Sequence, residues 1–139
     1  MAGPRRSPGE RVPETEKITI NLGYVDLGRI DLLVQEGFYS NRTDFIRTAI
    51  RNQLGTHAEE MSRSMARHTL ELGLRDIGAA DLEAAREAGE RLHIRVVGLL
   101  RIAQDVTPEL ARATIGSITV LGALQATPEL KTALADRTK

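Results

Sequence analysis

The first strong pattern in the chain is a strict alternation of polar and apolar residues from position 17 to position 22. A period of two predicts a strand with one buried face, because successive side chains of a strand point to opposite sides. A strand of this length needs a partner for its backbone N–H and C=O groups, and no second strand follows closely. The segment must therefore find a partner strand, and the remainder of this part of the chain suggests that the partner is another copy of the segment itself. The apolar positions are Ile18, Ile20 and Leu22, and the polar positions are Lys17, Thr19 and Asn21.

Two helices are predicted after this strand by apolar residues at helical spacing. The first begins near Asp26, as its N-cap or as an acidic residue of its first turn, and ends at Gly37, where a left-handed residue is usual. At the start of the second, Asn41 and Asp44 have the spacing of a capping box, and Ser40 is a competing N-cap. The apolar stripes are Leu27, Ile30, Leu33 and Val34 in the first helix and Phe45, Ile46, Ala49, Ile50 and Leu54 in the second.

The apolar stripe of the second helix continues beyond Gly55. We expect a nearly continuous helix to about His68, with Gly55 as the place of any kink, since glycine costs only about 1 kcal/mol in a helix interior. The residues that continue the stripe are Ala58, Met61, Met65 and Leu72.

From residue 69 onward the pattern becomes a repeat. Residues 94–100 and 118–124 both read Ile-x-Val-x-Gly-x-Leu, and Thr-Pro-Glu-Leu follows each of them, at 107–110 and at 127–130. Threonine as N-cap and proline at the first helical position predict a helix start. Strands that alternate with helices predict parallel pairing with right-handed crossovers.

A degenerate first copy of the repeat precedes these two. It consists of residues 70–74, followed by a predicted helix over about 80–88 that ends at Gly89. In a parallel sheet of three such strands, we expect the equivalent glycines to stack, at a bulge or a close backbone contact. These glycines are Gly73, Gly98 and Gly122.

Composition limits the classes of protein that fit these patterns. The chain has 139 residues, 41% hydrophobic and 27% charged, with 19 basic and 19 acidic residues. A net charge of zero excludes binding to nucleic acid through bulk positive charge, so any such binding needs a local patch. The absence of cysteine excludes disulfides and thiolate metal sites. No apolar run approaches the ~20 residues that span a bilayer, and the N-terminus lacks a signal-peptide core, so we expect a cytoplasmic protein.

The aromatic residues all lie between Tyr24 and Phe45, so the later core must be aliphatic and two structural units are predicted. We expect a disordered arm at 1–15, whose arginines would contact phosphates or only aid solubility. The fold class is predicted to be α+β. The domains that follow the arm are a strand–helix–helix domain at 16–55, a helical connector at 56–68 and a strand–helix repeat domain for oligomerisation or regulation at 69–136.

The segment from Lys17 to Leu54 resembles the ribbon-helix-helix family of DNA-binding proteins. The resemblance lies in the alternating strand, the short helix that ends at Gly37 and the Ser-Asn-Arg-Thr-Asp-Phe-Ile-Arg opening of the second helix. It implies an intertwined homodimer, in which one strand from each chain forms an antiparallel ribbon that enters the major groove of double-stranded DNA. A two-stranded ribbon has the right width for that groove.

The resemblance also implies roles for individual residues. The side chains expected to read base edges are Lys17, Thr19 and Asn21, and those expected to hold a phosphate are Asn41, Arg42 and Thr43. The expected dimer core consists of Ile18, Ile20, Leu22, Ile30, Phe45, Ile46 and Ile50. The alternative is a solvated strand face and a simple helix cap. Acidic and basic residues balance over 16–55, so we expect low non-specific affinity and cooperative binding of several dimers.

These patterns favour a sequence-specific transcriptional repressor, associated with the nucleoid, that acts as a homodimer or as a higher oligomer joined through its C-terminal domain. Two alternatives stay open: an antitoxin that binds a toxin partner, and a plasmid-partition or DNA-architectural protein. We expect no enzyme, no catalytic residue, no cofactor and no metal site. No Ser/His/Asp grouping is visible, and His57 and His68 lie eleven residues apart (68 minus 57), too far to share one ion.

Overall fold

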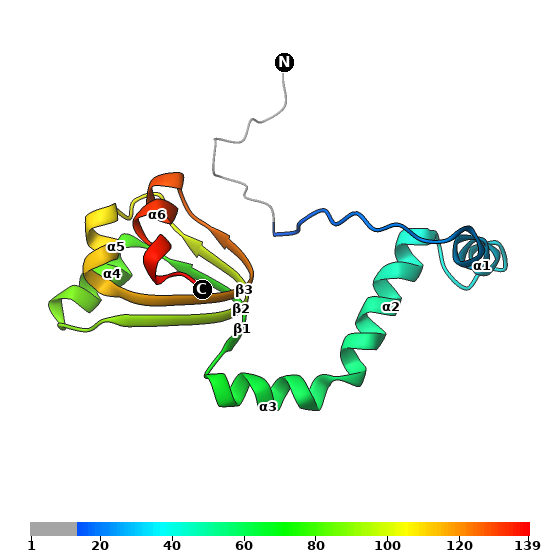
Figure 1. Ribbon diagram of the computed structural model, residues 1–139, viewed down its shortest axis with the longest axis horizontal. Helices are drawn as coiled ribbons and strands as arrows, with labels where there is room; N and C mark the ends of the chain where they lie inside the picture. Colours follow the sequence, from blue (N-terminus) through cyan, green and yellow to red (C-terminus); the bar gives the residue numbers. More distant parts are fainter. Residues whose placement is uncertain (1–13) are drawn as a thin grey trace, which may run out of the picture. The chain divides into compact units, whose positions relative to one another are not determined.

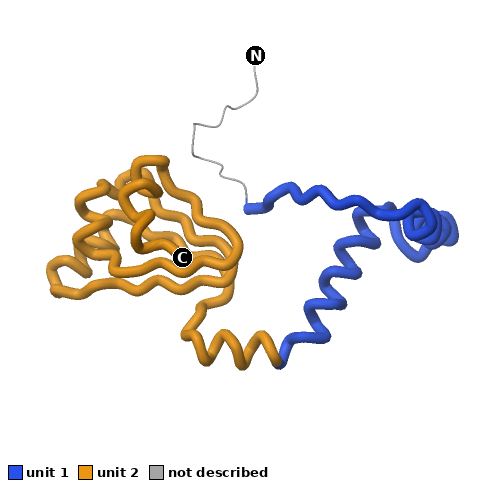
Figure 2. The backbone as a smooth tube through the Cα atoms, viewed as in Figure 1, with its two compact units in different colours: residues 1–59 blue, residues 60–139 orange. Residues whose placement is uncertain are grey.

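The chain folds into two compact units that meet between Glu59 and Glu60 (Figure 2). The computed structural model describes residues 14–139, so most of the predicted N-terminal arm lies outside the described residues. The first unit contains helices and extended chain, and the second contains a sheet with its covering helices. The mixed α+β content predicted from the sequence is confirmed.

The first unit begins with residues 17–22, which run as extended chain and belong to no strand (Figure 1). Helix α1 (Tyr24–Gln35) follows, with Gly23 as its N-cap and Asp26 in its first turn. Asp26 is therefore a first-turn acid and not the N-cap. Gly37, just beyond the helix, has a φ of 87°, which confirms the predicted left-handed stop.

The long second helix predicted from the sequence is divided. Helix α2 (Arg42–Thr56) ends at the C-cap His57, and helix α3 (Ala58–His68) starts directly after it. The interruption falls at His57, so the expectation of a kink at Gly55 is wrong, whereas the predicted end at His68 is confirmed. Near this break the hydroxyl of Thr56 donates a hydrogen bond to the carbonyl oxygen of Gln53, at 2.7 Å.

The second unit is a parallel sheet whose strands follow each other in chain order, β1-β2-β3. The predicted alternation of parallel strands and helices is confirmed. Because this sheet is parallel, it is not the antiparallel ribbon expected for residues 17–22, which needs a second chain. The elements are β1 (Glu71–Ile77), α4 (Ala79–Glu87), β2 (Leu92–Ile102), α5 (Pro108–Thr114), β3 (Ile115–Gln125), α6 (Pro128–Ala133) and a short 3-10 turn (Ala135–Arg137).

The two Thr-Pro-Glu-Leu motifs start helices, as predicted. The hydroxyl oxygen of Thr107 accepts a hydrogen bond from the backbone N–H of Leu110, at 3.1 Å. The hydroxyl oxygen of Thr127 accepts the same bond from Leu130, at 3.2 Å. Each threonine thus satisfies one of the N–H groups that a helix start leaves without an intrahelical partner.

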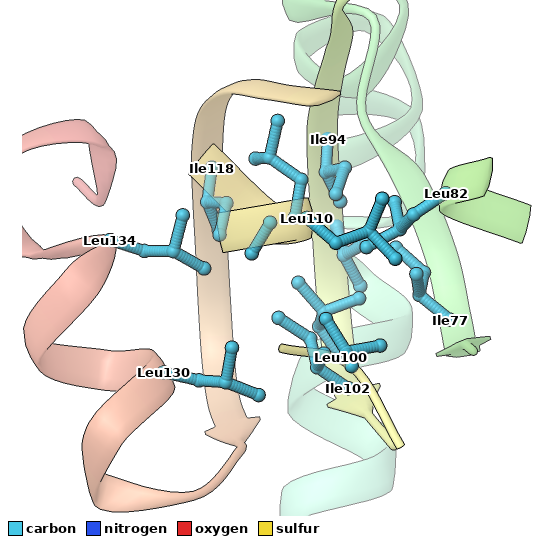
Figure 3. Close-up of a cluster of buried hydrophobic side chains, with 13 residues drawn as sticks. Ile77, Leu82, Ile94, Leu100, Ile102, Leu110, Ile118, Leu130 and Leu134 are labelled. Atoms are coloured by element: carbon cyan, nitrogen blue, oxygen red, sulfur yellow. The ribbon is translucent and has the colours of Figure 1, made fainter. Parts of the chain in front are cut away.

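The core of the second unit lies between the sheet and its three α-helices (Figure 3). Leu82 of α4 and Leu130 of α6 are fully buried and point towards the strands, and no aromatic ring takes part. Aliphatic side chains of this kind contribute about 1.5–3 kcal/mol each when they are fully buried. The unit therefore buries a core within a single chain. The strand residues of this core are Ile77, Ile94, Val96, Leu100, Ile102, Ile115 and Ile118.

A row of three glycines crosses the middle of the sheet. The register pairs Gly73 with Gly98 and Gly98 with Gly122, which confirms the predicted stacking. All three have positive φ, at 125°, 140° and 124° in chain order, a conformation that favours glycine. A Cβ on Gly98 would overlap the carbonyl oxygen of Gly73, and a Cβ on Gly122 would overlap that of Gly98. In contrast, nothing lies within 4 Å of a Cβ placed on Gly73.

This difference predicts unequal costs for two alanine substitutions. Gly73→Ala introduces only backbone strain and should lower the free energy of unfolding by about 1–3 kcal/mol. Gly98→Ala adds a clash with a backbone carbonyl and should cost about 2–6 kcal/mol. Urea unfolding followed by circular dichroism, at low protein concentration, measures both. Equal losses for the two variants would contradict the close backbone contact at Gly98.

Candidate nucleic-acid interface

The segment expected to read DNA is exposed on both of its faces in the single chain. The polar residues Lys17, Thr19 and Asn21 are solvent-exposed, as sequence reasoning anticipated for a reading face. The apolar residues on the other face are exposed as well, with Ile18 at 78% and Ile20 at 59%. Contiguous exposed apolar surface marks an interaction site, so this row is a candidate contact surface.

Exposed apolar side chains continue over both helices of the first unit. Among its described residues, only Ile30, 6% exposed, is buried. Of the other residues expected in a dimer core, Phe45 and Ile46 are half-buried and Ile50 is exposed. These residues therefore lie in one small helical unit, but the single chain does not bury them. Other large exposed hydrophobic residues of this unit are Leu22, Tyr24, Val25, Leu32, Phe38 and Leu54.

The start of α2 has a side-chain N-cap. Asn41 is the N-cap, and its Oδ1 atom accepts a hydrogen bond from the backbone N–H of Asp44, at 2.8 Å. The carboxylate of Asp44 in turn accepts a hydrogen bond from the backbone N–H of Ser40, at 2.9 Å. The predicted Asn41–Asp44 pair is confirmed, although Asp44 bonds to the N–H of Ser40 and not to that of Asn41. Ser40 is not the N-cap.

Two exposed residues follow this cap, Arg42 and Thr43, at the first two positions of α2. Backbone N–H groups at these positions have no intrahelical acceptor, and the helix dipole places a partial positive charge there. An anion such as a phosphate fits this environment. The rings of Tyr39 and Phe45 pack in a T-shaped arrangement, with centroids 5.0 Å apart, and this contact holds the corner that leads into the helix.

The side chain of Arg42 is held by Asp31 of α1. Its Nε and Nη2 atoms donate to Oδ1 and Oδ2 of the carboxylate, both at 2.8 Å. These hydrogen bonds lower the pKa of Asp31 below its ordinary 3.8 and raise the pKa of Arg42. The pair joins the two helices and orients the guanidinium. A guanidinium has five N–H donors, so three remain for a further acceptor.

Sequence reasoning named Arg42 and missed Asp31. The two residues lie eleven positions apart (42 minus 31) on different helices, and no local pattern marks such a pair. Only the packing of α1 against α2 brings them together. The carboxylate of Asp31 lowers the net positive charge at the expected phosphate site. Attraction of a phosphate there therefore depends more on the backbone N–H groups.

A second, shallow site lies in the second unit, between the end of α3 and the strands. Its volume is about 470 Å³. One wall is polar, because the guanidinium of Arg95 donates to the carbonyl oxygen of His68 at 3.2 Å. No motif in the sequence indicated this hollow. Its lining residues are Ser64, His68, Leu70, Arg95, Thr119 and Leu121.

Among the described residues, 14–139, the structure contains no group of three or more histidine or acidic side chains positioned to hold a metal ion. No helix in the same range is long and apolar enough to cross a membrane.

Neither the curated proteins nor the solved structures include a significant match to this chain. A sequence profile of the ribbon-helix-helix transcriptional regulator family matches residues 13–131, which covers the candidate interface and most of the second unit. The extent of this match confirms the resemblance found at residues 17–54. The chain is thus a member of the ribbon-helix-helix family of transcriptional regulators.

Proposed function

We propose that the protein is a homodimeric transcriptional repressor that reads the major groove of DNA with a two-stranded antiparallel ribbon, one strand from each chain. The observation that carries this proposal is the apolar surface of the first unit. A helical unit that buries one side chain, Ile30, and exposes Ile18, Ile20 and Ile50 has no core of its own. Burial of such side chains supplies most of the stability of a folded unit.

Pairing of two chains along residues 17–22 supplies the missing core. The apolar side of the ribbon then packs on both pairs of helices, and the polar side faces outward. Strand alternation places Lys17, Thr19 and Asn21 together on that outer side. An asparagine bonds an adenine edge in two directions, a lysine donates to guanine, and a threonine methyl contacts thymine.

The start of α2 serves as the phosphate clamp in this proposal. Its exposed first turn offers the N–H groups of Arg42 and Thr43, and Asn41 fixes the helix start. Asp31 keeps the guanidinium of Arg42 in one orientation, which reduces the entropy lost when a phosphate binds. Phosphate contacts of this type set the register of a protein on DNA and leave base choice to the ribbon.

The folded second unit favours a regulator over an antitoxin. Tails that fold onto a toxin are short and charged, whereas residues 71–137 form a sheet with a closed aliphatic core. A unit of this kind is suited to joining dimers. Repression by several adjacent dimers also compensates for the absence of net positive charge over residues 16–55.

The dimer core can be tested with a matched pair of substitutions one residue apart. Ile20→Asp places a charge in the proposed core and should raise the dimer dissociation constant at least about a hundredfold, since a buried unpaired charge costs several kcal/mol. Thr19→Asp places the same charge on the outer face and should leave the dimer intact. Sedimentation equilibrium measures both. A dimer that survives Ile20→Asp, or one that Thr19→Asp disrupts, would contradict the assignment of faces.

The DNA interface can be tested by gel shift with the DNA upstream of the protein's own gene and with unrelated DNA. Asn21→Ala should weaken operator binding by about 1–3 kcal/mol for each lost base contact and leave unrelated DNA unaffected. Arg42→Ala should weaken both kinds of DNA alike and reduce the salt slope by about 1 for each phosphate contact.

Arg51→Ala is the control for the loss of positive charge. Arg51 is exposed on α2, more than two turns beyond its start, so its loss should change neither affinity nor salt slope by a comparable amount. If the unsubstituted protein retards its upstream DNA no better than unrelated DNA, the proposed function is wrong. If Asn21→Ala and Arg42→Ala give the opposite patterns, the two surfaces are misassigned.

A further inference from the structure

The sheet of the second unit has two outer edges. Strand order makes β1 one edge strand and β3 the other. Among the described residues, β1 pairs with β2 alone, and β3 pairs with β2 and, at Ile118, with Thr138. An edge strand presents N–H and C=O groups that can pair with another strand. Both edges are parallel strands of the same repeat, so they run in the same direction.

The glycine row gives these two edges complementary shapes. At Gly98 and at Gly122, the space where a Cβ would lie is filled by the carbonyl oxygen of the glycine on the preceding strand. The same space at Gly73 is empty to at least 4 Å, although its φ of 125° matches the other two. By the geometry of the repeat, the carbonyl oxygen of Gly122 points away from β2, out of the opposite edge. The β3 edge therefore has a projecting carbonyl oxygen, at Gly122, and the β1 edge has an empty space of matching position, at Gly73.

We propose that β1 of a second copy of this chain adds to the outer edge of β3 as a parallel strand, with Gly122 opposite Gly73 of the second copy. The carbonyl oxygen of Gly122 then fills the space at that Gly73, and the glycine row runs through both sheets. The contact is heterologous, because it joins two different edges. Such contacts do not close in a pair and build a chain or a ring of copies.

The length of the strands fits this register. β1 begins at Glu71, opposite Val96, so it leaves the earlier part of β2, around Ile94, uncovered. At the equivalent place on β3, the backbone N–H of Lys139 donates to the carbonyl oxygen of Ile118, at 2.8 Å. The C-terminal segment and an added β1 would thus occupy successive parts of the β3 edge without overlap. The ion pair between Arg112 and Asp136, at 3.1 Å, holds that C-terminal segment in place.

The side chains on the sheet face away from the core also continue across the junction. Leu72, Val97 and Leu121 form one row of this face in the observed register. Leu72 is 74% exposed and Leu121 is 60% exposed, at opposite ends of the row. The added strand would place Leu72 of the second copy beside Leu121, and both would lose contact with water. Aliphatic neighbours on adjacent strands stabilise a sheet.

Charges on the other face limit the strength of this contact. Glu71 and Arg75 form an ion pair of 3.5 Å at positions where β2 has Val96 and Leu100. Charged residues at an edge oppose tight association. The contact is therefore expected to be reversible and to require a high local concentration of the protein. Dimers bound side by side on one DNA molecule reach such a concentration. Only this role on DNA rests on the proposed function; the contact itself does not.

Engineered cysteines test the register, since the natural chain has none. We would prepare one chain with Leu72→Cys, one with Leu121→Cys and one with both, and oxidise them at high concentration without DNA. The proposal requires disulfide-linked dimers in an equal mixture of the two single variants and little product from either variant alone. The double variant should give a ladder of products beyond the dimer on a denaturing gel.

Three results would overturn the proposal. Strong cross-linking of Leu72→Cys or Leu121→Cys with itself would indicate a two-fold contact of like surfaces. A double variant that stops at the dimer would indicate a closed pair. No cross-linking in any sample would indicate that the edges do not meet. DNA binding measured by gel shift is a separate readout, so loss of the ladder with retained DNA binding contradicts this contact alone.

Gly73→Ala provides a second test in the double-cysteine chain. Its new Cβ has open space within the chain but would overlap the carbonyl oxygen of Gly122 in a second copy. The ladder should fall roughly tenfold or more. Leu74→Ala, on the same strand, is the control and should keep the ladder. Protein that remains folded by circular dichroism and still forms the full ladder after Gly73→Ala would refute the glycine contact.

Discussion

The apolar side chains of residues 17–54 need to be buried, and a single chain does not bury them. Ile18, Ile20 and Leu22 lie on an extended segment, and the two helices that follow bury only Ile30. Helices this short gain most of their stability from packing of an apolar face. In the proposed dimer, a second chain encloses these side chains and determines which side of the ribbon faces outward. The proposed reading surface is thus a consequence of the core: residues excluded from it by alternation face the DNA.

The second unit, in contrast, buries its core side chains within one chain. Its sheet and helices bury an aliphatic core without help, and the repeat that builds it is open at both ends. In such repeats each copy contacts only its neighbours, so the terminal copies have exposed edges. The glycine row makes the two edges complementary in shape. Residues 16–55 have no net charge, so in the proposed assembly the linking of several dimers raises the affinity for DNA.

Sequence patterns predicted most of the local structure because its causes are local. Gly37 ends a helix through its own backbone conformation, and Thr107 and Thr127 start helices through hydrogen bonds to residues three positions ahead. The repeat predicted parallel strands and the stacked glycines, since equivalent positions of a repeat come together in a sheet. The period of two at residues 17–22 predicts a strand that the single chain does not form, so pairing of this segment between two chains stays a prediction.

The features that sequence reasoning missed depend on contacts between distant residues or on small conformational choices. The hydrogen bonds between Arg42 and Asp31 arise only after α1 and α2 pack together. The interruption at His57 falls two residues after Gly55, which lies inside α2, and no local pattern in the sequence marks His57 as the end of a helix. The bridge between Thr138 and Ile118 likewise follows from the fold of the whole second unit.

The central claim is that residues 17–22 of two chains pair as an antiparallel ribbon. The most direct measurement is an isotope-filtered nuclear Overhauser experiment on a mixture of labelled and unlabelled full-length chains. The account predicts backbone contacts between labelled and unlabelled chains within residues 17–22, in an antiparallel pattern in which Ile18 of one chain lies near Leu22 or its neighbours in the other. Contacts confined to single chains, or none at all in a protein that remains folded, would contradict it.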